Sequence, residues 1–425
     1  MKVKHLLSKL TQSKFSRDTL WLIGAQATVL MVGFVLNMGI EKHYGIAELG
    51  YFSQSVSFYM ICSSLFALGL NNTVIKKIAD QRLSQEQKHL IFSQNLFLTL
   101  AISSVLSVSV FLMLQFFPTL FSSHELVHLL RIHIIGIPFF SVNKQFAAYY
   151  TGERQQHLFA IQRFIRWFGI GVLFFAIVFF NFSLVYVIYA FVLIEILLFV
   201  FNVYQNFRSI VFRLDREEIK SSLQFGIKSY IAEIVAVFNS NLDLIILGYL
   251  LSSVEIGIYS FLIFFVKALY IFPGIIMQNI SPLISTLWQN KQIEELQRKI
   301  KSVVKVNLII SLIQFIGMIV FYYSIVHLFK TSMDGSAFYF VIAGFGTFIF
   351  SLVSWSGSML VMSGKLRANF YRTLMILIVS TVNILVFGYY FELVGACIAV
   401  CINGILNFLI MRILIKKEMG INVFV

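Results

Sequence analysis

Charge is scarce in this chain of 425 residues, and cysteine is scarcer. Only 12% of the residues are Asp, Glu, Lys or Arg, whereas 59% are hydrophobic, which excludes an ordinary soluble domain. The three cysteines all fall within apolar segments, so the sequence offers no disulfide framework. Every second gap between the apolar segments is short, mostly under about ten residues. This argues against an enzyme that works with a folded domain outside the membrane.

Twelve apolar segments run through the chain. They lie at 19–40, 50–70, 90–117, 126–150, 158–180, 184–207, 222–250, 257–288, 303–329, 336–362, 370–390 and 394–415. Each is long enough to cross a hydrocarbon core, which needs about 20 helical residues. The first lacks a small-residue cleavage site, and we expect it to be a retained span and not a signal peptide. The sequence predicts an all-α integral membrane protein with twelve transmembrane helices.

The basic residues are distributed unevenly between the gaps. Of the 33 Lys and Arg residues, 29 lie in or beside the N-terminal segment, the C-terminal segment and every second gap. The other four are Lys42, Arg131, Lys267 and Lys330. By the positive-inside rule, this bias predicts that both termini lie in the cytoplasm. Orientation and contact with anionic membrane lipids then account for the net charge of +14, and we expect no nucleic-acid partner.

Two short sequence matches indicate an internal duplication. Glu48–Ser53 matches Glu255–Ser260 at an offset of 207 residues, and Thr151–Arg154 matches Ser363–Arg367 at an offset of 212. A repeated unit of six spans has both ends on one side of the membrane, so the two copies have parallel orientation. The predicted six-helix bundles are 1–210 and 211–425. Such a pair of bundles suits transport by alternating access.

Helix-weakening residues fall in two of the predicted spans. Gly136 and Pro138 lie in the fourth, and Pro273, Gly274 and Pro282 lie in the eighth. Neighbouring helices can satisfy the backbone groups that a proline frees. These positions are either hinges for a rocking motion or static kinks that improve packing, and the sequence leaves both open.

Three charged residues fall near the middle of predicted spans. Glu195, Glu233 and Lys267 all lie at a similar depth if each residue rises 1.5 Å along its helix. A charge at this depth costs about 2.5–3.5 kcal/mol on insertion scales and needs a reason. One reading is a buried ion pair of Lys267 with either carboxylate. The other is a lysine that attracts phosphate beside a carboxylate that exchanges protons.

Further basic residues form a candidate vestibule on the cytoplasmic side. Arg163 and Arg166 share one helix face at i, i+3, and Lys228 lies at a similar depth in the seventh span. A pyrophosphate group needs such a field, because guanidinium groups bind phosphate oxygens in pairs. Snorkelling toward the anionic inner leaflet is the alternative. Arg131, in the outer part of the fourth span, is either a contact on the release side or an interface anchor.

Four segments resemble a known family. They are Asn241–Gly248, Glu255–Ser260, Gly364–Arg367 and Leu393–Ala399. With the span count, they resemble polysaccharide repeat-unit flippases of the Wzx type, which serve O-antigen and capsule synthesis. That family belongs to the superfamily of multidrug and toxin extruders (MATE) and oligosaccharidyl-lipid exporters. Asp243 matches the motif of the seventh span, where a structural hydrogen bond is as reasonable a role as a functional one.

The resemblance implies a fold, a cargo and a location. The fold is MATE-like, with two six-helix bundles around a V-shaped cavity. The cargo is undecaprenyl pyrophosphate that carries a short oligosaccharide, moved from the cytoplasmic to the periplasmic leaflet of a bacterial inner membrane. A polymerase and a chain-length regulator are the partners that such a flippase serves. No cofactor is expected, and coupling to either a proton or a sodium gradient stays open.

One motif points to different chemistry. His124-Glu125-Leu126-Val127-His128 is an HExxH sequence, which binds zinc in metalloproteases. Ser122 and Ser123 before it are typical of a helix N-cap, and Glu125 suits the first turn of a helix. Intramembrane zinc proteases usually add an aspartate from another span, and the only Asp-Gly pair of this chain, Asp334-Gly335, lies in an outer gap. We therefore predict no metal site and no enzymatic activity.

Two other functions compete with a flippase. An ion-coupled multidrug exporter of the same superfamily would usually carry a carboxylate in the first span, and none occurs between Leu20 and Ile40. Its cationic cargo would also favour an acidic cavity, whereas the intramembrane charges here are mostly basic. A polymerase or ligase of polysaccharide synthesis would need a large outer loop, which the gaps do not provide.

Overall fold

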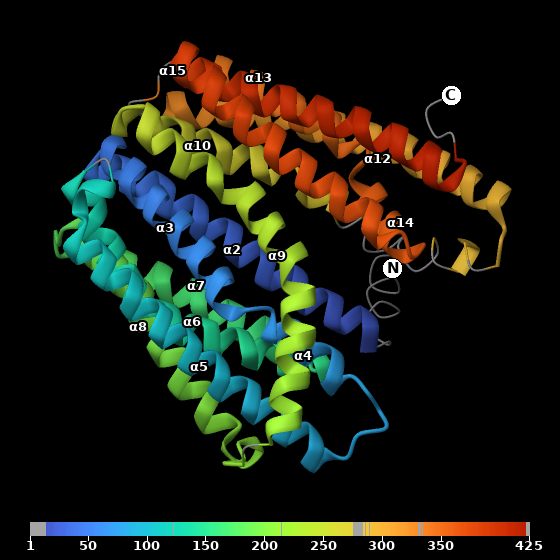
Figure 1. Cartoon of the computed structure of the whole chain (residues 1–425). Coiled ribbons are helices and arrows are strands. Elements are labelled where there is room, and N and C mark those ends of the chain that lie inside the picture. Colours follow the sequence, from blue (N-terminus) through green and yellow to red (C-terminus); the bar gives the residue numbers. More distant parts are fainter. Residues whose placement is uncertain are drawn as a thin grey trace, which may run out of the picture. The chain divides into compact units, whose positions relative to one another are not determined.

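The computed structural model of the chain describes residues 14–421, apart from 122, 214, 275–283, 285, 289, 330–332 and 334. Within these residues the chain is almost entirely helical and contains no strand (Figure 1). The long helices are α2 (Lys14–Tyr44), α3 (Ile46–Ala67), α4 (Leu70–Ile78), α5 (Gln85–Phe116), α6 (His124–Gly152), α7 (Gln156–Phe179), α8 (Leu184–Gln205), α9 (Arg216–Leu250), α10 (Ser253–Ala268), α12 (Ile293–Leu328), α13 (Ser336–Ser351), α14 (Ser354–Met362) and α15 (Leu366–Met419).

These helices supply twelve membrane-spanning segments in the described part of the chain. Nine helices are long and apolar enough to cross a membrane, and two bent pairs, α3 with α4 and α13 with α14, raise the number to eleven. The longest helix, α15, divides in two because the backbone of Glu392 is not helical (φ 50°, ψ −133°). Each of the twelve predicted spans overlaps one of these segments. The predicted all-α, twelve-span membrane protein is thereby confirmed.

The described residues form two compact units. Unit 1 comprises those within 1–44 and 54–237, and unit 2 those within 45–53 and 238–425. The chain passes from one unit to the other three times, between α2 and α3, inside α3 and inside α9. The boundary of the duplicated halves between residues 210 and 211 stays a prediction. Each unit has its own apolar core, which contains Phe92 and Phe146 in unit 1 and Trp355 and Met411 in unit 2.

A sharp bend separates α3 from α4 in unit 1. The axes of the two helices differ by 57°, and Leu68 and Gly69 at the bend have positive φ angles of 45° and 67°. Glycine is required at the second position for a further reason, since a Cβ there would lie 2.4 Å from the carbonyl oxygen of Gly226 in α9. The bend therefore brings the first turn of α4 against α9, where the site described below is found.

A tight hairpin joins the two arms of α15 in unit 2. Its tip is at Glu392, and a Cβ at Gly395 would lie 1.8 Å from the carbonyl oxygen of Phe387, so only glycine fits. The Asn383 amide donates to the Asn403 side-chain oxygen across the hairpin at 2.7 Å. The arms are thus antiparallel neighbours, and they correspond to the predicted spans 370–390 and 394–415.

Proline and glycine mark the close approach of α6 and α8. Pro138 lies inside α6, where it leaves one backbone carbonyl without its helical partner. A Cβ at Gly136 would lie 3.2 Å from the side chain of Val192 in α8. Pro273 lies in a helical turn beyond α10, and Pro282 lies outside the described residues. That these positions act as hinges stays a prediction.

Candidate functional site

Unit 1 contains an ion pair between the neighbouring helices α7 and α8. The guanidinium group of Arg166 donates from Nε to Oε1 of Glu195 and from Nη2 to Oε2, the latter at 3.1 Å. Only 17% of the Arg166 side chain and 4% of the Glu195 side chain are exposed. A bidentate pair of this kind is among the strongest charge-assisted interactions available to a protein. Arg166 and Glu195 were each predicted to lie within a span, but their pairing was not predicted.

An amide network extends from this ion pair along α6 and α8. The Asn143 amide donates to Oε2 of Glu195 at 2.8 Å and to its backbone oxygen at 2.9 Å. Asn202 donates to the Asn143 side-chain oxygen at 3.0 Å, and the Tyr150 hydroxyl donates to the Asn202 side-chain oxygen at 3.2 Å. The network satisfies Glu195 and fixes its orientation, since a buried polar group without partners is costly.

A second cation lies close to the pair. The Lys144 ammonium is 5.2 Å from the centre of the Phe140 ring, and the Arg166 guanidinium is 4.9 Å from the same ring. Cations are attracted to the face of an aromatic ring at such distances. Among the described residues, Lys144 forms no ion pair. With Arg163 one turn from Arg166, this part of unit 1 has more positive than negative charge. Lys144 is a site residue that the sequence analysis did not single out.

Glu233 belongs to α9 and lies beside the bend between α3 and α4. Its Oε2 atom accepts from the Asn72 amide at 2.9 Å and from the Asn71 amide at 3.5 Å. Both amides belong to the first turn of α4, which the bend at Gly69 brings against α9. The carboxylate is thus held by neutral donors, whereas the sequence analysis offered Lys267 as one partner. It lies within electrostatic range of Lys144.

The remaining predicted residues of unit 1 lie apart from this cluster or at its edge. Arg131 donates to the backbone oxygen of Leu114 in α5 at 2.8 Å, which fits an anchoring role. Arg163 is partly buried one turn from Arg166, and Lys228 is exposed on α9. Their predicted role in binding a substrate stays a prediction.

In unit 2, Lys267 and Asp243 are each held by one contact with a neighbouring helix. The Lys267 ammonium donates to the backbone oxygen of Ser240 at 2.7 Å, and Lys267 is exposed. The Tyr259 hydroxyl donates to Oδ2 of Asp243 at 2.9 Å. This hydrogen bond joins α9 to α10, in keeping with the structural role that the sequence analysis kept open for Asp243.

The HExxH segment begins α6. Ser123 is the N-cap, and its hydroxyl accepts from the backbone N–H of Leu126 at 3.1 Å, which confirms the predicted cap at this serine; Ser122 lies outside the described residues. His133 is buried beside Tyr59 and Phe191, at ring distances of 5.0 and 5.8 Å. No group of three or more His, Cys, Asp or Glu side chains in the described part of the chain is arranged to hold a metal ion.

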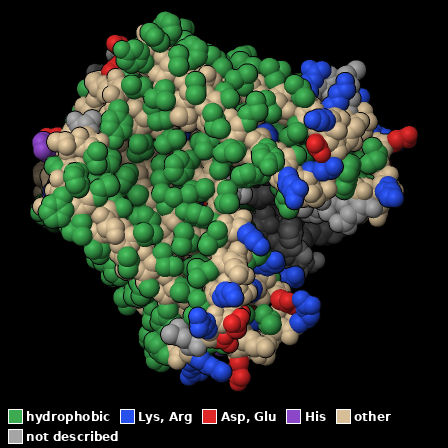
Figure 2. All heavy atoms as spheres, viewed as in Figure 1, with side chains coloured by type: hydrophobic (Ala, Val, Ile, Leu, Met, Phe, Trp, Pro, Cys, Tyr) green, Lys and Arg blue, Asp and Glu red, His purple; other side chains and the backbone are tan. Residues whose placement is uncertain are grey.

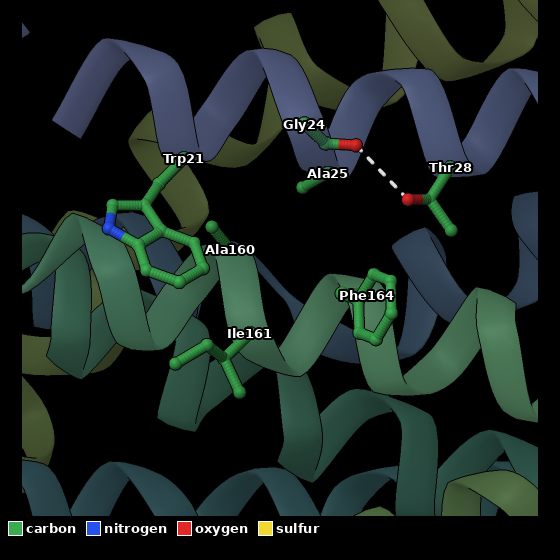
Figure 3. Close-up of a pocket in the computed structure, with 7 residues that line it drawn as sticks. All are labelled: Trp21, Gly24, Ala25, Thr28, Ala160, Ile161 and Phe164. Atoms are coloured by element: carbon green, nitrogen blue, oxygen red, sulfur yellow. Dashed lines mark hydrogen bonds between the residues drawn. The ribbon is translucent and has the colours of Figure 1, made fainter. Parts of the chain in front are cut away.

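A groove of about 410 Å³ lies between α2 and α7 in unit 1. Figure 3 shows its lining side chains facing one another from the two helices. The lining consists of Trp21, Gly24, Ala25, Thr28, Ala160, Ile161 and Phe164. Apart from the Thr28 hydroxyl, which donates to the backbone oxygen of Gly24 at 3.1 Å, the lining side chains are apolar. The groove suits a hydrocarbon chain, and the sequence analysis did not anticipate it.

Basic side chains gather at one end of unit 1. Lys77 at the end of α4 pairs with Glu218 at 2.6 Å, and Lys88 at the start of α5 pairs with Glu153 at 2.9 Å. Figure 2 shows Lys and Arg side chains gathered at the bottom and at the upper right of the visible face, with hydrophobic side chains over most of the rest. In the loop between α4 and α5, hydrogen bonds from Arg82 lower the pKa of Asp80 to about 2. This end suits an aqueous, anionic membrane surface.

The sequence matches a family model described as polysaccharide biosynthesis protein over residues 15–288. The match covers more than half of the chain, and the chain therefore belongs to the polysaccharide biosynthesis protein family. No curated protein sequence matches it.

Several solved structures share its fold. A MATE family multidrug resistance transporter of the MOP superfamily, in an inward-facing conformation, is 15% identical with a TM-score of 0.79, over 92% of this chain and 96% of that one. The lipid II flippase MurJ, in an inward closed conformation, is 16% identical with a TM-score of 0.75, over 94% and 87%. The MATE multidrug transporter DinF-BH, in a ligand complex, is 18% identical with a TM-score of 0.65, over 95% and 96%. The chain is thus a multi-pass membrane protein with the fold of these transporters.

Proposed function

We propose that this protein is a flippase that moves undecaprenyl-pyrophosphate-linked oligosaccharides across a bacterial inner membrane, from the cytoplasmic to the periplasmic leaflet, by alternating access. Membership of the polysaccharide biosynthesis protein family supports a cargo used in making polysaccharides. The observation that carries the proposal is the placement of two cations, Arg166 and Lys144, beside one aromatic ring within membrane-spanning helices, with Lys144 in no ion pair among the described residues. A cargo with an anionic head group gives such charges a purpose, since each is costly at that depth.

The head group and the lipid chain of this cargo need different surroundings. In unit 1, Lys144 and Arg166, with Arg163 and Lys228 as further contacts, supply the N–H donors that phosphate oxygens require. Lys267 is a separate proposed contact in unit 2. The apolar groove beside Trp21 and Phe164 supplies a surface on which a prenyl chain lies without exposing hydrocarbon to water. Both features involve helix α7, so one helix serves both ends of the cargo.

Glu195 is the proposed control on the cationic group. While ionised, its carboxylate holds Arg166 through two hydrogen bonds. Protonation of Glu195 would weaken this pair and leave the guanidinium free to bind phosphate, because a neutral carboxyl is a poorer acceptor. Coupling to protons through Glu195 follows from this, with Glu233 as the second carboxylate within the membrane.

The proposal is tested with purified protein in lipid vesicles. Undecaprenyl pyrophosphate that carries a fluorescent oligosaccharide is placed in both leaflets, and a membrane-impermeant quencher then reports the fraction that changes leaflet over time. We expect the protein to speed translocation at least tenfold over protein-free vesicles. Translocation no faster than in protein-free vesicles contradicts the proposal.

Two variants connect the assay to the site. Arg166→Gln with Glu195→Gln removes both charges of the pair and spares the fold, whereas Lys144→Gln removes the unpaired cation. We expect both variants to translocate the cargo at least tenfold more slowly than the wild type. Arg367→Gln, which removes an exposed charge at the start of α15, is the matched control and is expected to leave the rate unchanged.

The same vesicles loaded with a cationic dye test for a multidrug exporter, and dye efflux without movement of the lipid-linked cargo would support that function instead.

A further inference from the structure

Arg372 lies about 9 Å along α15 from its first residue, at 1.5 Å per residue. Its Nη1 atom donates to the side-chain oxygen of Asn407 on the other arm of the hairpin at 3.0 Å. Its Nη2 atom donates to the Thr373 hydroxyl at 3.1 Å. The Nε atom is buried and has no hydrogen-bond partner. A guanidinium group carries five N–H donors, and these two hydrogen bonds engage only two of them.

The charge of Arg372 is uncompensated in the described part of unit 2. Both of its hydrogen-bond acceptors are neutral, and no described carboxylate pairs with it. The ion pair on this helix, between Lys365 and Glu418 at 3.3 Å, involves neither the guanidinium nor its partners. Arginine stays protonated in proteins, so Arg372 cannot relieve the cost of burial by losing a proton. A partly buried cation with spare donors and no counter-ion is suited to an anion from outside the chain.

The surroundings of Arg372 favour an oxyanion over other ligands. Thr373 and Asn407 supply a hydroxyl group and an amide group beside it, and neither is charged. Gly357 in α14 also abuts the site, since a Cβ at Gly357 would lie 3.9 Å from Nη2 of Arg372. Planar guanidinium groups bind phosphate oxygens in a bidentate manner.

We propose that Arg372 is the centre of a phosphate-binding site in unit 2, formed with Thr373 and Asn407, that takes a phosphate or pyrophosphate group. This inference rests on the proposed function in one respect: the source of the phosphate is the head group of a lipid-linked cargo. It gives unit 2 a phosphate contact of its own. The sequence analysis counted Arg372 among the loop charges and assigned it no role.

The test measures binding of undecaprenyl pyrophosphate to the full-length protein in nanodiscs. We expect Arg372→Gln to weaken binding at least tenfold, and Arg372→Lys to fall between this variant and the wild type because lysine keeps the charge but not the planar fork. Arg367→Gln removes the same charge from an exposed position on the same helix and is expected to bind within twofold of the wild type. Binding of Arg372→Gln within twofold of the wild type overturns the inference.

A second variant guards against a simple loss of fold. Asn407→Asp keeps the guanidinium in place but supplies the counter-ion that unit 2 lacks, so it is expected to weaken binding at least fivefold. A wild-type affinity in this variant also overturns the inference. Inorganic pyrophosphate, added as a competitor, identifies the source. If it displaces the lipid from the wild type, the phosphate group alone suffices, and if only the lipid binds in an Arg372-dependent manner, the site requires the whole head group.

The two proposals fail in different ways. If the wild type translocates the lipid-linked cargo and Arg372→Gln still binds undecaprenyl pyrophosphate normally, the Arg372 site is wrong and the flippase stands. If the wild type binds the lipid in an Arg372-dependent manner but does not translocate it, the phosphate site stands and the proposed function is wrong.

Discussion

Arg166 in unit 1 and Arg372 in unit 2 occupy comparable places in their helix pairs, but Arg166 has a charged partner and Arg372 a neutral one. Each lies on the first of two neighbouring antiparallel spans, α7 and α8 in one unit and the two arms of α15 in the other. Arg166 is held by the carboxylate of Glu195 in two hydrogen bonds. Arg372 is held across the helix pair by the neutral amide of Asn407 in one.

The difference separates two roles for a buried arginine. A compensated arginine holds helices together and becomes available to an anion only when its carboxylate is protonated or displaced. An uncompensated arginine is available at all times and adds little to stability. The same pair of spans therefore provides a controlled cationic group in one unit and a permanent one in the other. Substitutions that remove or exchange the partner charges test this reading directly.

The largest effect on stability is expected for Arg166→Gln. This variant leaves Glu195 buried without its counter-ion, and breaking a buried pair in this way costs about 3–5 kcal/mol of unfolding free energy. The double variant Arg166→Gln with Glu195→Gln is expected to recover most of the loss, because no charge is left unpaired. Chemical denaturation in detergent, followed by tryptophan fluorescence, provides the measurement. A single variant as stable as the wild type would show that the pair does not hold unit 1 together.

Asn143→Leu measures how much the amide network contributes to the unfolding free energy. This substitution removes the donor to Glu195 and the acceptor for Asn202, and each buried polar group left without a partner costs about 1–3 kcal/mol. We expect a loss in that range, smaller than for Arg166→Gln because the ion pair itself remains. Asn383→Leu, which breaks the amide contact with Asn403 in unit 2, is the matched comparison. Equal stability of Asn143→Leu and the wild type would contradict the network's role.

The sequence predicted the spans well and the partners of the intramembrane charges poorly. The length of an apolar segment can be read directly from the sequence, so the twelve spans follow from composition alone. Glu195, Glu233 and Lys267 could be singled out because a charge is rare at that depth. Which charges meet depends on the rotation and tilt of two helices, which a single sequence does not encode locally. The bend at Gly69, which carries Asn71 and Asn72 to Glu233, was not predicted for the same reason.

The spacing of some other site residues in the sequence is a weak indication of their position. Asn202 and Asn206 stand at i, i+4 within an otherwise apolar span, and the amide of Asn206 donates to the Tyr150 hydroxyl at 2.7 Å. Polar amides at helical spacing in an apolar span predict one polar face. Arg372 lies close enough to the end of its span to be counted as a loop charge. The burial of Arg372 depends on the hairpin, which brings Asn407 beside it.

Asn407→Asp makes unit 2 resemble unit 1. The new carboxylate would pair with Arg372, and because the attraction roughly balances the cost of burying a second charge, the unfolding free energy is expected to change by less than about 1 kcal/mol. Thermal unfolding of the purified variant checks this expectation. A loss of several kcal/mol would mean that the hairpin cannot accommodate a second charge, and the comparison between the units would fail.

The smallest effect is expected at an exposed ion pair. Arg82 lowers the pKa of Asp80 from 3.8 to about 2, so any contribution of Asp80 to stability is present above its unfolded-state pKa and is lost as the pH falls through about 4 to 2. Surface pairs of this kind contribute little. We expect Asp80→Asn and the wild type to unfold at the same temperature from pH 5 to 8. A clear difference in that range would contradict the contrast drawn between exposed and buried pairs.

The central claim is that the cationic groups of both units serve an anionic, lipid-linked cargo. The most direct measurement compares, in the same vesicles, the translocation rate of an oligosaccharide linked to undecaprenyl pyrophosphate with that of the same oligosaccharide linked to neutral undecaprenol. We predict that the protein moves the pyrophosphate-linked lipid at least tenfold faster than the neutral one. Equal rates for the two lipids, or faster movement of the neutral lipid, would contradict the account.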